Sequence, residues 1–254
     1  MRILKSFAFN FRAALLMFPM LALTIGTLQM HSQITVQPGQ SVPDLTQVAK
    51  CTFSDYFTNG HSYGWLRINR AWHVYRGRYV LDGGYLSNAI GRDGFTVTHL
   101  GDKSCRNYAL QATFDITNPA GLPSPDVHNA FFFVRVQSPP PDGTFFRIAV
   151  WPKGTLDPRG GPHNGVALPN GLVWIDKYVE GSVVRSVDRE YSNSVTGTNE
   201  ITVKSEANVI RVWINGEYIL KFVDDETSSQ PVRYGGIGMG AIWEAQAWFD
   251  NVVV

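Results

Sequence analysis

The stretch RVWINGEYILKFVDD, residues 211–225, decides the fold that we predict. Two short runs of largely alternating apolar and polar residues lie on either side of Asn215 and Gly216. A two-residue type I′ turn needs positive φ at both central positions, which Asn and Gly tolerate best. The stretch therefore predicts a β-hairpin, with Trp213 on the less aliphatic face. Alternation places Ile210, Val212 and Ile214 on one face of the first strand and groups Tyr218, Leu220 and Phe222 on the second.

The chain from residue 51 onward continues this pattern. Charged residues make up 17% of the 254 residues, and 24 Gly and 14 Pro are typical of many short strands joined by turns. No segment sustains a 3.6-residue period over three helical turns, so we predict a single all-β domain over 51–254. The clearest predicted strands are 108–116, 130–137, 145–151, 172–179, 200–205, 209–214, 217–223 and 247–254.

The two-residue period sorts the side chains of these strands onto two faces. One face is aliphatic, for example Ile148 and Val150, or Val173 and Ile175. The other mixes aromatic rings with polar groups. We place on this mixed face Gln111, Arg135, Arg147, Trp151, Trp174 and Asp176.

The order of these features resembles the concanavalin A-like lectin/glucanase superfamily. The resemblance rests on FSDYFTNG, AWHVYRGRYVLDGG, NYALQATFDI, NAFFFVRV, VIRVWINGEYILKFVDD, GGIGMG and the terminal WFDNVVV. Within the superfamily it is similar to laminin-G-like modules and to 3-keto-disaccharide hydrolase domains. The resemblance implies a jelly-roll β-sandwich of two curved antiparallel sheets that handles glycans, with a ligand on the concave sheet or its rim loops.

The mixed face has the chemistry that a saccharide site needs, since a sugar ring offers an apolar C–H face and an edge of hydroxyls. Trp151 and Trp174 would stack on a ring. Gln111, Arg135, Arg147 and Asp176 would bind hydroxyls or an acidic group. The alternative is that the aromatic rings are core or are covered by a loop, because Trp is usually highly buried.

The sequence favours a secreted, lectin-like binding module over an enzyme, and we assign no catalytic residue. The Glu-x-Asp-x-x-Glu strand motif of the superfamily's glucanases does not occur. The nearest carboxylate groupings, DREY (188–191) and DDE (224–226), lie in apparent turns and are expected to be solvated surface. Asp176 near Arg147 is either half of a catalytic pair or a salt bridge. Two alternatives stay open: a glycoside-cleaving enzyme like the 3-keto-disaccharide hydrolases, and a structural or adhesive protein that contacts another surface protein.

The N-terminus has the plan of a secretory signal peptide over residues 1–32. Arg2, Lys5 and Arg12 precede an uncharged apolar run from Ala13 to about Leu28. A retained membrane anchor is the alternative. Residues 33–50 are polar and turn-rich, which indicates a linker or N-terminal arm. We expect a secreted or cell-surface protein, and the net charge of +1 argues against nucleic acid as a partner.

Three further expectations concern cysteines and metal ions. Cys51 and Cys105 are the only cysteines, and in an oxidising compartment we expect a disulfide, the alternative being two unpaired thiols. The resemblance implies a structural Ca²⁺ near the chain ends, where pairing of the first and last strands would bring Asp55 close to Asp250. Two aspartates are too few for the six to eight oxygen ligands of Ca²⁺, so the alternative is that they act as turn residues. We predict no other cofactor.

Overall fold

The computed structural model describes residues 52–254 except 63, 69–71, 82–93, 99–102, 104, 118–128, 160–164, 193–196, 226–229 and 242–245. The predicted signal peptide, the linker and Cys51 lie outside the described residues. Within those ranges the chain forms fifteen strands and no helix, so the all-β prediction is confirmed. No helix of the described part is therefore long and apolar enough to cross a membrane.

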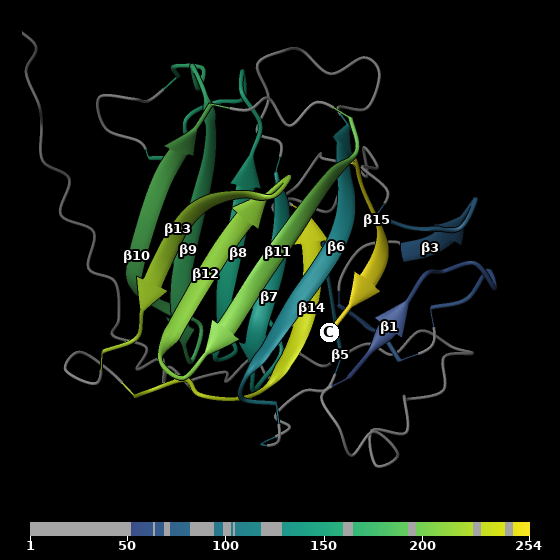
Figure 1. Ribbon diagram of the computed structural model, residues 1–254, viewed down its shortest axis with the longest axis horizontal. Coiled ribbons are helices and arrows are strands. Elements are labelled where there is room, and N and C mark those ends of the chain that lie inside the picture. The colour runs from purple at the N-terminus through teal and green to yellow at the C-terminus, as the bar shows by residue number, and fades with distance from the viewer. Residues whose placement is uncertain are drawn as a thin grey trace, which may run out of the picture. The chain divides into compact units, whose positions relative to one another are not determined.

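The strands form two antiparallel sheets, the arrangement of a jelly-roll sandwich. Sheet A has the order β13 (Glu217–Val223), β12 (Val209–Ile214), β11 (Asn199–Glu206), β6 (Tyr108–Thr117), β15 (Gln246–Val253), β4 (Arg78–Leu81) and β3 (Trp72–Tyr75), with β1 (Ser54–Asp55) paired to β15. Sheet B has the order β10 (Ser182–Tyr191), β9 (Gly171–Val179), β8 (Phe145–Trp151), β7 (Ala130–Val136), β14 (Gly236–Ala241), β5 (Gly94–Thr98) and β2 (Leu66–Ile68). Figure 1 shows β13, β12, β11 and β6 of sheet A in front of β10, β9, β8 and β7 of sheet B.

The core lies between the two sheets and follows the predicted alternation over most of its extent. Phe146, Ile148 and Val150 of β8 pack there with Leu110, Ala112 and Phe114 of β6, and with Val173 and Ile175 of β9. The hairpin that decided the fold is also confirmed. Asn215 and Gly216 have φ of 51° and 78°, as a type I′ turn requires, and Ile210, Val212 and Ile214 are buried.

A β-bulge in β7 reverses the expected direction of Arg135. The register between β14 and β7 shifts between Gly236 and Gly238, and Arg135 has φ of 54°. An extra residue in one strand sends the following side chain to the other face. Arg135 therefore points into the sandwich and is fully buried, where its guanidinium donates to Ser205 Oγ at 2.7 Å and to the carbonyl of Val232 at 2.8 Å. The prediction that Arg135 lies on the mixed face is wrong.

A second irregularity changes the hairpin's return strand. The register between β12 and β13 shifts after Val212, so that Trp213 lies opposite Tyr218. Ile219 and Leu220 are both buried, whereas Tyr218 is exposed. The predicted grouping of Tyr218 with Leu220 and Phe222 is wrong for the same physical reason: the two-residue period ends where a bulge begins.

The segment GGIGMG, residues 235–240, lies almost entirely in β14, an interior strand of sheet B between β7 and β5. At Gly238 an added Cβ would lie 2.6 Å from the carbonyl oxygen of Thr96 and 3.2 Å from Phe133 Cδ2. Glycine is therefore required because the neighbouring strand and a phenylalanine ring close over this position.

The DDE grouping also differs from the expected solvated turn. Asp224 is buried and its carboxylate binds Lys177 Nζ at 2.6 Å, on the inward face of β9. The same carboxylate accepts a hydrogen bond of 3.0 Å from the backbone N–H of Val232. Asp225 pairs with Arg185 at 2.9 Å, at the edge where β10 and β13 meet. Asp224 is therefore a buried structural residue, whereas Asp225 is half exposed in its ion pair and Glu226 lies outside the described residues.

Candidate functional site

The candidate site lies on the outer face of sheet B. The polarity and the exposure of the side chains on this face change from one strand to the next. Over β7 and the start of β8 it is apolar and buried, with Phe131, Phe133 and Phe145 in one cluster. Over β8, β9 and β10 it becomes polar and partly exposed. We call this second region the polar strip and define it as Arg147, Trp174, Asp176, Ser186 and Asp188.

Arg147 and Asp176 are register partners on β8 and β9 and form the centre of the polar strip. The Asp176 carboxylate accepts hydrogen bonds from Arg147 Nε at 3.1 Å and Nη2 at 2.6 Å, and from Ser186 Oγ at 2.5 Å. Both carboxylate oxygens therefore hold donors. The sequence left open whether Asp176 is half of a catalytic pair or forms a salt bridge with Arg147. The structure shows the salt bridge.

The Arg147 guanidinium is also held between two aromatic rings. Its Cζ lies 4.8 Å from the ring centroid of Phe131 and 5.1 Å from that of Tyr178. Tyr178 in turn stacks on Phe145, with centroids 4.6 Å apart. A guanidinium that is fixed by a carboxylate and by ring faces keeps its remaining N–H groups in a defined direction. The Arg147 side chain is 24% exposed, so a ligand on this face can reach it.

Trp174 is the partly exposed aromatic residue of the strip. It lies opposite Ala149 of β8 on one side and opposite Asp188 of β10 on the other. The indole is partly buried and packs against the apolar cluster that contains Ala149 and Leu172. Its Nε1 is buried and has no hydrogen-bond partner among the described residues. Trp174 therefore combines a partly exposed aromatic side chain with a carboxylate neighbour.

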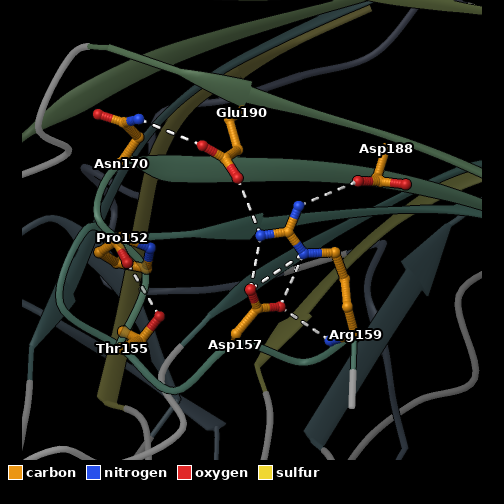
Figure 2. A network of polar contacts seen from close by, with 7 residues as sticks. All are labelled: Pro152, Thr155, Asp157, Arg159, Asn170, Asp188 and Glu190. Carbon is orange, nitrogen blue, oxygen red and sulfur yellow. Dashed lines mark hydrogen bonds and ion pairs between the residues drawn. The ribbon is translucent and has the colours of Figure 1, made fainter. Parts of the chain in front are cut away.

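The loop between β8 and β9 is fastened to β10 at the end of the polar strip, as Figure 2 shows. Arg159 binds Asp157 with Nη2 at 2.5 Å, and the same nitrogen donates to Glu190 Oε1 at 2.9 Å. Its Nη1 lies 3.9 Å from Asp188. Asn170 donates to the other Glu190 oxygen at 3.2 Å. This network fixes the loop beside Asp188 and Glu190.

The hydrogen bonds of this network favour the charged forms of Glu190 and Arg159. The hydrogen bond from Asn170 and then that from Arg159 hold the pKa of Glu190 below its ordinary value. The hydrogen bond to Asp157 raises the pKa of Arg159. Glu190 is thus a carboxylate, with lone pairs left for further donors because each oxygen accepts one hydrogen bond here.

The structure separates the six residues that were predicted to form one cluster. Arg147, Trp174 and Asp176 lie together on the outer face of sheet B. Trp151 lies on the same face but is buried in an apolar cluster with Leu168 of the β8–β9 loop. This agrees with the alternative that a loop covers the aromatic rings. Gln111 is exposed on β6 of sheet A, the other sheet, and Arg135 is inside the sandwich.

The sequence analysis missed Ser186 and Asp188 of the strip, and Glu190 and Arg159 beside it. Asp188 and Glu190 belong to DREY, which forms part of strand β10 and is not the expected turn. Their alternation with Val187 and Arg189 was the signal that could have revealed a strand. Arg159 had no such signal, because it reaches β10 from a loop. Trp213, which the sequence places on the less aliphatic face of its hairpin, lies on sheet A and not beside the strip.

Asp55 and Asp250 approach each other as expected, because β1 pairs with β15 and places Asp55 opposite Val252. The Asp55 oxygens accept hydrogen bonds from the Phe57 N–H at 2.8 Å and from Trp65 Nε1 at 3.0 Å. Burial raises the pKa of Asp55, and the charge of Asp250 acts in the same direction. The described residues contain no group of three or more His, Cys, Asp or Glu that could hold a metal ion. Structural Ca²⁺ stays a prediction.

Cys105 is fully buried, and its carbonyl accepts a hydrogen bond of 3.1 Å from the Gly235 N–H. The described residues contain no free cysteine. Because Cys51 lies outside them, the pairing of Cys51 with Cys105 stays a prediction.

Comparisons with known proteins agree with this architecture. No curated protein matches the chain. A laminarinase catalytic domain from Thermotoga petrophila RKU-1 is 10% identical, with a TM-score of 0.52 and coverage of 80% of this chain and 96% of that one. A lichenase derived from a mouse hindgut metagenome is 14% identical, with a TM-score of 0.51 and coverage of 80% and 97%. The Emp47p carbohydrate recognition domain is 14% identical, with a TM-score of 0.50 and coverage of 80% and 96%.

These solved structures share the concanavalin A-like jelly-roll fold with this chain, as the sequence predicted. The model of one family also matches residues 53–254, which is nearly the whole described region. The chain belongs to the 3-keto-alpha-glucoside-1,2-lyase-like domain family.

Proposed function

We propose that this protein binds a saccharide non-covalently on the polar strip of sheet B. The observation that supports the proposal is the fixed Arg147 guanidinium beside the partly exposed Trp174 ring. The names of the family and of the similar structures, which include a carbohydrate recognition domain and two glucanases, support a carbohydrate as the ligand class.

Each group of the strip has a role in this proposal. Trp174 would contact the apolar C–H face of a sugar ring. Arg147 would donate to hydroxyl oxygens with the N–H groups that Asp176 does not use. Asp188, whose contact in the structure is a long 3.9 Å ion pair with Arg159, would accept hydrogen bonds from hydroxyls. The bonds that fix Arg147 before binding reduce the side-chain entropy that a ligand must overcome.

A glycan array with the wild type and three single variants tests the proposal. Trp174→Ala and Arg147→Ala should abolish or strongly reduce the signal on at least one glycan that the wild type binds. Gln111→Ala is the matched control, since Gln111 is an exposed polar residue on the other sheet and should bind like the wild type. Unchanged binding by both strip variants would refute the proposal.

A second candidate function, glycoside cleavage, has one observation in its favour. Asp188 and Glu190 point to the same face of β10 and are two residues apart, which corresponds to about 7 Å along a strand. Paired carboxylates of glycosidases are about 5–9.5 Å apart. Product release from an oligosaccharide panel distinguishes the candidates: cleavage that is lost in Asp188→Asn favours an enzyme, and binding without products favours a lectin-like module.

A further inference from the structure

The edge strands β10 and β13 of the two sheets meet at the open edge of the sandwich (Figure 1). A groove lies at this edge. We call it the edge groove. It has a volume of about 310 Å³ and is lined by Asn170, Arg189, Glu190, Tyr191, Ser192, Glu217, Tyr218 and Ile219. Ligand pockets begin at about 300 Å³, so this volume suits one or two sugar rings better than a long chain.

The floor of the groove is rigid. Arg189 Nη1 donates to the carbonyl of Ile219 at 2.7 Å and so joins the two edge strands. Tyr191 is buried, and its ring packs so closely on Gly171 that an added Cβ there would lie 2.2 Å from Tyr191 Cζ. A groove with such a floor exists before a ligand arrives, which lowers the ordering cost of binding.

The wall of the groove offers an aromatic ring. The Tyr218 side chain is 42% exposed, although large aromatic residues are usually much more buried. Its ring meets Trp213 edge-to-face, with centroids 5.6 Å apart, so its orientation is fixed. The β-bulge at Ile219 causes this exposure, because it sends Tyr218 outward where alternation would have buried it.

Planar polar groups line the same groove as that ring. Asn170 and Glu190 are already bonded to each other and keep hydrogen-bonding capacity. The Arg189 guanidinium has five N–H donors, of which the bond to Ile219 uses one. An exposed ring beside amide, carboxylate and guanidinium groups is the combination that recognises a sugar and its hydroxyls.

We infer that the edge groove is a second saccharide site, which takes a terminal unit of one or two neutral sugar rings. The inference rests on the proposed function for its class of ligand, but the groove shares no residue with the polar strip, since Glu190 of the groove lies two residues beyond Asp188 of the strip on β10. Tyr218 stacks on the ring, and Arg189 and Asn170 donate to its hydroxyls.

Amide NMR of the full chain with maltotriose, cellotriose and chitotriose as probes tests the inference and reports on each site separately. We expect at least one trisaccharide to shift the amide signals of Asn170, Ser192 and Gly216–Ile219. Tyr218→Ala should weaken this binding about tenfold, the loss expected for one stacking ring. Arg189→Gln should also weaken it. The matched control is Tyr75→Ala, because Tyr75 is 46% exposed and lies on β3, outside the groove.

The outcomes separate this inference from the proposed function. Trp174→Ala should leave the groove signals responsive, whereas Tyr218→Ala should leave the strip signals responsive. No shift at the groove with any of the three probes would overturn the inference, even if the strip responds. Wild-type affinity in Tyr218→Ala, or an equal loss in Tyr75→Ala, would overturn it as well.

Discussion

Arg147 and Asp176 face each other across β8 and β9, joined by hydrogen bonds of 3.1 Å and 2.6 Å from one guanidinium to one carboxylate oxygen. Ser186 occupies the other oxygen of Asp176 from β10. Three neighbouring strands thus hold one arginine, whose free N–H groups form the centre of the proposed saccharide site. Asp176 acts on a ligand through Arg147, so it is a positioning residue.

Replacement of Asp176 should destabilise the protein and disorder Arg147. Asp176→Asn removes a buried charge partner, and we expect a loss of about 1–3 kcal/mol in the free energy of unfolding. The exposed Asp188 has only a 3.9 Å ion pair, so Asp188→Asn, the control, should cost about 0–1 kcal/mol. Urea unfolding measures both, and equal losses would contradict this account of the pair.

Replacement of one partner in the buried ion pair between Lys177 and Asp224 should destabilise the protein more than replacement of Asp176. Lys177 and Asp224 lie 2.6 Å apart and are almost fully buried. Lys177→Met leaves the Asp224 charge buried without this partner, and we expect a loss of about 3–5 kcal/mol. The double variant Lys177→Met/Asp224→Asn should recover part of that loss, because Asn still accepts from the Val232 N–H. A double variant less stable than Lys177→Met alone would show that the charge is not the cause.

Acid should weaken the attachment of the β8–β9 loop to β10. The pKa of Glu190 is lowered below 4.5, so its contribution to stability is complete above that pH and is lost as the pH falls through the folded-state value. Between about pH 5 and about pH 3, the melting temperature of the wild type should therefore fall more than that of Glu190→Gln. Parallel curves for the two proteins would contradict the role of Glu190.

Sheet B should tolerate no side chain at Gly238. Gly238→Ala forces a Cβ against the Thr96 carbonyl and the Phe133 ring, and we expect a loss of about 1–3 kcal/mol. Gly238→Val should cost more, because the added methyl groups increase the overlap. Thermal unfolding checks this order, and an alanine variant as stable as the wild type would disprove the close packing.

The predicted disulfide calls for a direct chemical test. If Cys51 pairs with Cys105, non-reducing peptide mapping of protein produced in an oxidising compartment should yield one linked peptide. The bond closes a long loop, so Cys51→Ser should lower the free energy of unfolding by about 4 kcal/mol. Two alkylatable thiols in the unfolded protein would refute the pairing.

Much of the fold could be predicted because alternation and turn chemistry act locally. Ile148, Ile175 and Leu110 are core residues as their positions in the alternating pattern indicated. The Asn215-Gly216 turn has the expected positive φ values. These features need only the geometry of a pleated strand and the conformational freedom of two residue types.

The site was harder to predict because it depends on bulges and on a polar edge strand. Arg135 and Tyr218 change faces at irregularities that alternation does not reveal. Strand β10 was missed because its inward positions include Arg185 and Arg189, which bond to carbonyls of β13. An edge strand that is secured by arginines lacks the apolar face that normally indicates a strand.

The central claim is that the ligand lies on the polar strip of sheet B. A crystal structure of the protein with a glycan identified on the array tests it most directly. We predict a sugar ring within about 4 Å of Trp174, in contact distance, with a hydroxyl bonded to Arg147. A glycan bound on the outer face of sheet A, beside Gln111, with the strip empty, would contradict the account.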